Sequence, residues 1–286
     1  MARGDPQRIV KTAAGPSEIL VALDGSELSR AALQAAIRLG RMFRTRIHVL
    51  HVVPKLEEYA GQTELLEPLL RKLSSVGEAI VEDAAKAVEA AGLEANTAVA
   101  HGVPAAEVTD YAKKNGIDLI AVGCRGLNTR GAQLLGSVSY QVSMLAPCSV
   151  LVVKDADPFP RILLALDGSE DSRRAADLVG ILGSKLESKV TVTFIIPSRP
   201  EGAFTLAASP AEPFLLETEK ALRDRGLAVV RDLRYGHPAE EIVKAASRHT
   251  LVALGARGRS DLALDYVGGV ADKVLRNSTV STLVVR

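Results

Sequence analysis

The sequence predicts an α/β protein of two tandem, doubly wound domains, each built on a five-stranded parallel sheet. Three observations carry this prediction. Runs such as ILVAL, residues 19–23, are apolar without alternation, as in strands that helices cover on both faces. Stretches of strand and helix character alternate along the chain. The whole series then occurs a second time, so each half is expected to form its own doubly wound sheet.

Length, charge and apolar runs narrow the class of protein. The 286 residues are enough for two ordinary domains. A formal net charge of +1 and the lack of a long basic run argue against nucleic acid or an anionic membrane surface as the main partner. No apolar run is long enough to span a bilayer, and residues 1–17 lack the apolar core of a signal peptide. We therefore expect a soluble, cytoplasmic protein.

The first domain is predicted over residues 17–154, after an N-terminal tail. Its first strand ends at Asp24, Ser26 is expected to cap the next helix, and Gly40 is expected to end that helix. Pro104 is placed to open a later helix, where the first turn tolerates it. The remaining elements are expected at residues 46–53 (strand), 65–91 (helix), 93–100 (strand), 104–116 (helix), 118–123 (strand), 137–145 (helix) and 149–153 (strand).

The second domain, predicted over residues 160–286, repeats this plan in shortened form. RILLALDGSE restates EILVALDGSE at an offset of 143 residues, from Glu18 to Arg161. Near the end of each half the offset is 132, from Gly123 to Gly255, so eleven residues are missing from the middle of the second half. Residues 197–213 are too rich in proline, glycine and alanine for a structural prediction, and the helix before the fourth strand is shortened.

One glycine-rich loop, GCRGLNTRGAQLLGS, carries the strongest chemical signal. Gly123, Gly126 and Gly136 lie between a strand and a helix, where backbone N–H groups can point at an anion without a Cβ in the way. Ser137 can add its hydroxyl, and the helix macrodipole adds partial positive charge. For a single copy, turn glycines and a capping serine would be the favoured explanation. Because the glycine spacing recurs at residues 255–269, we interpret the loop as a cradle for nucleotide phosphate.

Cysteine and histidine offer no further chemistry. Cys124 follows one strand and Cys148 precedes the next, so in a parallel sheet they fall at opposite ends, beyond disulfide reach. Two free thiols are expected. Cys124 lies inside the loop, where a small tolerated side chain is favoured over a redox role. The five histidines show no metal-ligand spacing.

An apolar strand that ends in Asp-Gly-Ser, a Gly-x2-Gly-x9-Gly-Ser loop and a closing LVV strand together resemble the universal stress protein family, here as a tandem pair. The resemblance implies an ATP-binding fold of the adenine nucleotide alpha hydrolase type, with strand order 3-2-1-4-5. It also implies that two such domains pair through their last strands, here residues 150–153 and 282–285. A stress-response role with an unidentified protein partner follows from the same likeness, and association into a homodimer stays open.

The resemblance also assigns roles to single residues. Asp24 would lie beside the ribose or phosphates of ATP, directly or through Mg²⁺; the alternative is a helix cap or a turn former. Val52 would offer backbone groups to adenine, although a buried strand valine fits the sequence as well. The loop residues that would hold phosphate are Gly123, Gly126, Gly136 and Ser137, with Arg125 and Arg130 as further candidates, and their counterparts in the second half are Asp167, Gly255, Gly258 and Gly268.

The second half departs from the family pattern in two ways. Gly269 stands where the pattern has Ser or Thr, and the loop carries Asp261 and Asp265 where the first loop carries Arg130. Negative charge beside a polyphosphate weakens binding unless a metal intervenes. We therefore expect the tighter ATP site in the first half.

Three classes of function remain open. The first is a protein in which ATP occupancy changes domain pairing or partner binding, with slow ATPase activity at most. The second is an enzyme on the same kind of sheet, such as an ATP pyrophosphatase, but LDGSE stands where a Ser-Gly-Gly-x-Asp-Ser loop would be expected. The third is a scaffold with vestigial sites. The sequence favours the first.

Overall fold

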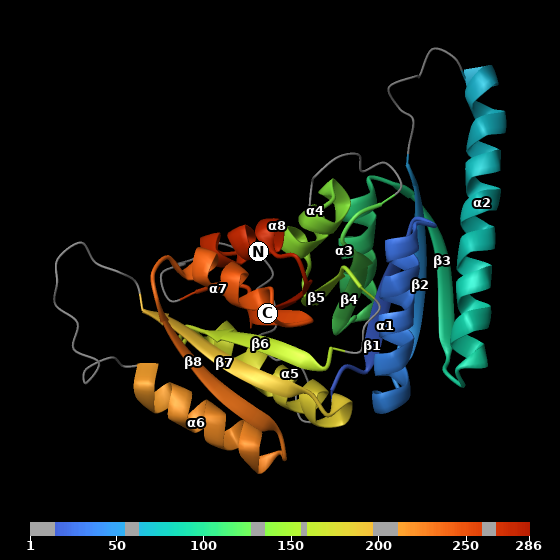
Figure 1. Ribbon diagram of the computed structural model, residues 1–286. Helices are drawn as coiled ribbons and strands as arrows, with labels where there is room; N and C mark the ends of the chain where they lie inside the picture. Colours follow the sequence, from blue (N-terminus) through green and yellow to red (C-terminus); the bar gives the residue numbers. More distant parts are fainter. Residues whose placement is uncertain (1–14, 55–62, 127–134, 156–158, 197–210, 259–266) are drawn as a thin grey trace, which may run out of the picture.

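Both halves of the chain join in one ten-stranded sheet with the strand order β3-β2-β1-β4-β5-β10-β9-β6-β7-β8. The computed structural model describes residues 15–54, 63–126, 135–155, 159–196, 211–258 and 267–286 (Figure 1). Each half has the predicted order 3-2-1-4-5, so the doubly wound α/β fold is confirmed.

The first half alternates strands and helices as the sequence indicates. Its elements are β1 (Glu18–Leu23), α1 (Glu27–Phe43), β2 (Arg46–Pro54), α2 (Thr63–Ala90), β3 (Ala95–Gly102), α3 (Pro104–Asn115), β4 (Leu119–Gly123), α4 (Ser137–Leu145) and β5 (Ser149–Val153).

The second half repeats the series with a shorter middle. Its elements are β6 (Arg161–Leu166), α5 (Glu170–Leu186), β7 (Lys189–Ile196), α6 (Ala211–Asp224), β8 (Ala228–Tyr235), α7 (Pro238–Ala246), β9 (Leu251–Gly255), α8 (Gly269–Asn277) and β10 (Ser281–Val285). Helix α6 begins inside the segment for which the sequence allowed no prediction, and α7 is shorter than α3, as expected.

Two helical layers sandwich the sheet, and each layer buries a separate apolar cluster. Helices α1, α2, α5 and α6 pack on one face and α3, α4, α7 and α8 on the other. Neighbouring residues of one strand serve both clusters: Ile19 contributes to the first and Leu20 to the second, and both are fully buried. This two-sided burial is the reason that the strands are continuously apolar.

Helix α1 begins as predicted but ends later. The Ser26 side chain accepts a hydrogen bond from the N–H of Ser29, which caps the helix. Gly40 does not end it, and the prediction was wrong here. A Cβ at Gly40 would lie 2.8 Å from Cδ1 of Leu93, so this glycine allows close packing. The helix continues to Phe43, and Arg44, whose φ is 55°, is its C-cap. Strand β3 is also shifted relative to the prediction, toward the C-terminus.

The two halves meet where β5 and β10 pair antiparallel, with Leu151 opposite Leu283. These are the strands that the resemblance implied would pair. Backbone N–H groups reinforce the join at both ends. Lys154 donates to the Ser281 hydroxyl at 3.0 Å, and Arg286 donates to the Ser149 hydroxyl at 3.4 Å. The two contacts occupy equivalent positions in the repeat, so the join is pseudo-symmetric.

The side chains of the same two basic residues cross between the halves. Lys154 donates to the carbonyl of Ser278, the C-cap of α8. Arg286 donates to the carbonyls of Ser143 and Met144 at 3.1 Å and 2.8 Å, near the end of α4. Positive charge at a helix C-terminus complements the macrodipole. Each half thus holds the last helix of the other.

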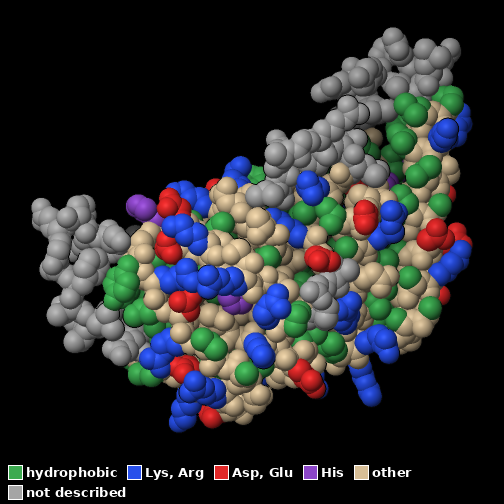
Figure 2. Space-filling model, viewed as in Figure 1, with side chains coloured by type: hydrophobic (Ala, Val, Ile, Leu, Met, Phe, Trp, Pro, Cys, Tyr) green, Lys and Arg blue, Asp and Glu red, His purple; other side chains and the backbone are tan. Residues whose placement is uncertain are grey.

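The outer surface carries charges of both signs. Figure 2 shows Lys and Arg interspersed with Asp and Glu over the face in view. Within the part of the chain that the structure describes, none of the helices is both long and apolar enough to cross a membrane.

Candidate nucleotide site

The predicted site lies at the carboxyl ends of β1 and β4, which are neighbours in the sheet. Asp24 follows β1 and accepts a hydrogen bond from the N–H of Ser26 through Oδ1, at 3.0 Å. Its other oxygen, Oδ2, faces Gly126, where an added Cβ would collide with it. Asp24 therefore does form the turn, and it also lines the start of the glycine loop.

Two of the glycines are required by the fold itself. A Cβ at Gly123 would lie 2.6 Å from the backbone carbon of Leu28, and one at Gly255 would lie 2.7 Å from the backbone nitrogen of Ser172. The first turn of α1 therefore packs directly on the end of β4, and the first turn of α5 packs on the end of β9. These glycines allow the helix N-terminus to approach the loop, which brings further backbone N–H groups to the same edge.

The loop returns tightly to the strand before α4 begins. Gly136 is the N-cap of α4, and its N–H donates to the carbonyl of Cys124 at 2.6 Å. The buried Ser139 hydroxyl donates to the same carbonyl at 2.8 Å. Ser137 is the first helical residue and is exposed. Its hydroxyl lies where a phosphate at the helix N-terminus could reach it.

The remaining first-half candidates take two positions. The carbonyl of Arg125 accepts from the Ser26 hydroxyl at 3.5 Å, and its side chain is exposed beside the loop. Val52 lies near the carboxyl end of β2 and is half-buried. Arg130, together with Asp261 and Asp265 of the second loop, lies outside the described residues.

The second half contains a cavity of about 850 Å³ at the equivalent edge. One end is apolar, with Ile195 at the position of Val52, and the other end is formed by the glycine loop and Arg257. Such a volume is ample for a nucleotide. The lining residues are Ala165, Leu166, Asp167, Ser172, Phe194, Ile195, Pro238, Ile242, Leu254, Gly255, Ala256, Arg257, Gly258, Gly268, Gly269, Val270 and Ala271. The structure thus brings together all four second-half residues named from the sequence.

Sequence reasoning missed two residues of this second site. Asp171 is 4% exposed and accepts hydrogen bonds from Arg257, at 3.1 Å from the backbone N–H and 3.0 Å from Nε. Two signals were present: Arg257 is the repeat counterpart of Arg125, and Asp171 replaces Leu28, an apolar residue. An acidic residue in a first helical turn is common, however, and the contact itself is not visible in the sequence.

Burial shifts the pKa values of the two cysteine thiols and of Lys154. It raises the pKa of the Cys124 thiol, although the charges of Lys154 and Arg125 act in the opposite direction. Burial also lowers the pKa of Lys154, and it raises the pKa of Cys148 to about 12. Both cysteines are free. With thiols that stay protonated at neutral pH, Cys124 is a poor nucleophile.

The residues present fit a magnesium nucleotide only in a limited way. Within the described residues, no three or more His, Cys, Asp or Glu side chains gather where they could hold a metal. Asp24 would be the protein ligand in the first half, and the phosphates and water would complete the shell, as Mg²⁺ accepts readily.

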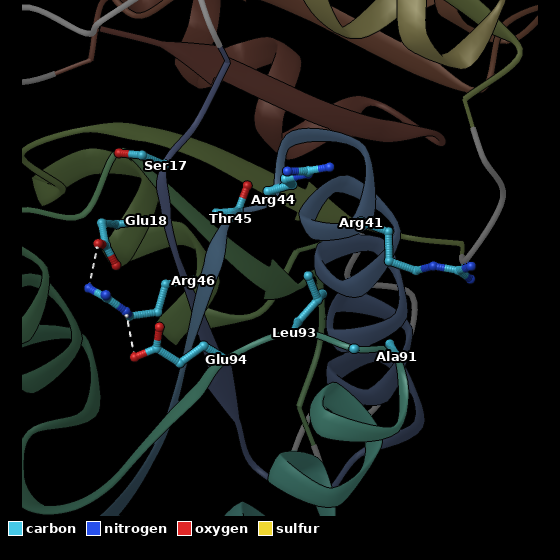
Figure 3. Close-up of a pocket in the computed structure, with 10 residues that line it drawn as sticks. Ser17, Glu18, Arg41, Arg44, Thr45, Arg46, Ala91, Leu93 and Glu94 are labelled. Atoms are coloured by element: carbon cyan, nitrogen blue, oxygen red, sulfur yellow. Dashed lines mark hydrogen bonds and ion pairs between the residues drawn. The ribbon is translucent and has the colours of Figure 1, made fainter.

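A second hollow, of about 580 Å³, lies at the opposite edge, near the amino ends of β1 and β2 (Figure 3). Its central Arg46 is paired with Glu18 at 2.9 Å and with Glu94 at 3.0 Å. Figure 3 shows that Arg41 and Arg44 point away from Arg46, so the guanidinium groups do not converge. Ligands of open α/β sheets bind at the carboxyl ends, so we place the site at the glycine loops.

Comparison with known proteins identifies the family of this chain. The model of a family described as the universal stress protein family matches residues 17–154 and 158–286. A universal stress protein of Mycobacterium tuberculosis (strain ATCC 25618 / H37Rv) is 30% identical over 294 residues, covering 94% of this chain and 96% of the relative. One from Bacillus subtilis (strain 168) is 34% identical over 146 residues, covering 48% of this chain and 99% of the relative.

A solved structure is similar along nearly the whole chain. The crystal structure of a universal stress protein from Archaeoglobus fulgidus DSM 4304 has a TM-score of 0.70 at 22% identity. The similarity covers 94% of this chain and 98% of that one. The tandem arrangement is therefore shared with a known fold.

Proposed function

The chain belongs to the universal stress protein family, and we propose that it is a stress-response or signalling protein that binds ATP at the carboxyl edge of its sheet. One observation carries the proposal: the collision that a Cβ at Gly126 would make with Asp24. A loop of glycines beside a carboxylate, next to the N-termini of α1 and α4, suits a phosphate with its counter-ion.

The ligand would lie with its phosphates on the glycine loop and its base toward β2. Asp24 would contact ribose or phosphate or hold Mg²⁺, Gly126 and Gly136 would give backbone N–H groups, and Ser137 a hydroxyl. Val52, close to the end of β2, would face adenine with its backbone. The equivalent arrangement in the second half is the cavity of about 850 Å³.

We propose further that occupancy changes how the halves pair. The first loop is tied to the join between the halves, because Cys124 donates its N–H to the carbonyl of Val153 at 2.8 Å. Lys154 follows directly and holds Ser278 at the end of α8. The equivalent bond in the second half joins Ala256 to Val285 at 2.7 Å, ahead of Arg286. A ligand that moves either loop would therefore act on the other half's last helix.

Hydrolysis would be slow or absent in this proposal. A general base must reach the attacking water, and Asp24 already uses one oxygen to hold the Ser26 N–H. An ATP pyrophosphatase or ATPase remains the competing function, and Asp24 would then be its base.

A thermal denaturation series tests the proposal. The full chain is heated alone and with Mg-ATP, ADP, AMP or GTP, because a ligand that binds the native state raises the melting temperature. We expect Mg-ATP to raise it, and GTP to raise it less. Equal melting temperatures with and without every nucleotide would overturn the proposal.

A further inference from the structure

A buried carboxylate holds the arginine of the second loop in place. Asp171, near the start of α5, uses Oδ2 to accept from both the backbone N–H and the Nε of Arg257. Its Oδ1 accepts from Nη1 of Arg174 at 3.0 Å. A buried carboxylate is costly unless it is paired in this way. The pairing therefore fixes both the loop backbone and the base of the guanidinium group.

The held arginine lies at the glycine end of the cavity. Arg257 lines the cavity with Gly258, Gly268 and Gly269, whereas Arg174, which shares the carboxylate, does not. The Arg257 side chain is 43% exposed and that of Asp171 only 4%. The acid is thus covered, and the cation is presented to the cavity.

The charged groups of this cluster differ in their access to the cavity. Two arginines share the single carboxylate of Asp171. Glu170 pairs with Arg174 only on the outer side, where 76% of the Glu170 side chain is exposed to solvent. Screening by water weakens the effect of Glu170 on the cavity. Arg257 is therefore the cation of this cluster that a phosphate would meet, beside the carboxylate of Asp167.

The first half has no carboxylate at the position of Asp171. Leu28 occupies the position of Asp171, and a leucine side chain cannot accept a hydrogen bond from Arg125. The first half instead has Ser137, whose counterpart is Gly269. The two sites therefore present different groups to a phosphate: a hydroxyl in one and a fixed guanidinium in the other.

We propose that Arg257 binds a phosphate group of the nucleotide in the second site and that Asp171 is its positioning residue. The inference rests on the proposed function and goes beyond it, because it assigns the second site its own mode of recognition. A guanidinium fork matches phosphate geometry, and holding it at Nε reduces the side-chain entropy lost on binding. The second site compensates for its missing serine in this way.

Calorimetric titration of the full chain with Mg-ATP and with adenosine tests the role. We expect Arg257→Gln to weaken ATP at the second site about tenfold to hundredfold, as for a hydrogen bond to a charged group, and to leave adenosine unchanged. Asp171→Leu, which installs the first-half residue, and Asp171→Asn should weaken ATP less. Arg174→Gln is the matched control, because it removes a partner of the same carboxylate outside the cavity, and its ATP affinity should equal that of the wild type.

Salt dependence separates a phosphate contact from a structural role. Loss of one cation at the phosphate should flatten the decline of ATP affinity with ionic strength in Arg257→Gln, whereas Arg257→Lys should retain the slope. Unchanged ATP affinity in folded Arg257→Gln, or equal weakening of adenosine and ATP, would overturn this inference and leave nucleotide binding intact. Failure of the wild type to bind any nucleotide would overturn the proposed function as well.

Discussion

Asp24 and Gly126 lie so close together that a Cβ atom at position 126 would collide with Oδ2 of Asp24. Gly126→Val should therefore displace the carboxylate and obstruct the phosphate position in the first half. Because Gly126 is exposed, the fold should change little. Calorimetry should show loss of the tight ATP site with a nearly unchanged melting temperature. Gly258→Val is the matched control and should retain that site, and unchanged ATP affinity in folded Gly126→Val would contradict the cradle.

Asp24→Asn tests for hydrolysis. The amide retains an oxygen for the Ser26 N–H, so the turn should persist. Wild-type protein with Mg-ATP should release phosphate far below the ~10 s⁻¹ typical of dedicated enzymes. The variant should reduce ATP affinity without any large change in that low rate. A wild-type rate near the typical value that Asp24→Asn abolishes would instead identify an enzyme.

Gly269→Ser should strengthen the second site. Among the described residues, no atom lies within 4 Å of a Cβ built at Gly269. A serine should therefore fit there and restore the hydroxyl that Ser137 supplies in the first half. A hydrogen bond of about 0.5 to 1.5 kcal/mol corresponds to at most a tenfold gain in ATP affinity. Gly269→Ala is the control, since it adds the Cβ alone. Equal affinities of the two variants would show that no phosphate lies within reach.

Arg286→Met should weaken the join between the halves. Its Nη2 donates to two carbonyls near the end of α4, and hydrogen bonds to a charged group contribute roughly 1.5–3 kcal/mol. The midpoint of urea denaturation should fall accordingly. Arg276→Met is the comparison. The guanidinium carbon of Arg276 lies 4.0 Å from the ring centre of Tyr140 in the other half, but the Arg276 side chain is exposed to solvent. Its substitution should therefore lower the urea midpoint less. The reverse ranking would contradict the crossing contacts.

Stability should fall on acidification through His249. Burial lowers the pKa of His249 below its ordinary value of 6.5. The unfolded chain then binds the proton more readily than the folded chain. The contribution of His249 to the free energy of unfolding is therefore complete above pH 6.5 and is lost as the pH falls from there through the folded-state pKa. His249 Nδ1 donates to Ala245, and Nε2 lies 2.9 Å from the Thr191 hydroxyl. His249→Gln should flatten the dependence of the unfolding free energy on pH between pH 7 and 5. An unchanged slope would show that another group takes up the proton on unfolding.

Individual residues show which structural features can be predicted from neighbouring residues in the sequence. Ser26, Pro104 and Gly116 were read correctly as helix boundaries, because capping and the left-handed φ of 64° at Gly116 depend on neighbouring residues. Gly40 was misread, because its role is set by Leu93, a residue on another element. Gly123 was assigned to phosphate, and the structure adds that the backbone of α1 requires it.

The sequence by itself determined the family, the doubly wound sheet and the place of the glycine loops, because apolar runs, caps and glycine spacing are local patterns that occur twice. Only the tertiary structure decided which groups surround each site. Asp171 and Arg257 are separated by 86 residues and meet because α5 packs on the end of β9. Lys154 reaches α8 for a similar reason, across the join of β5 and β10. Such contacts follow from the packing of whole elements, which no local pattern encodes.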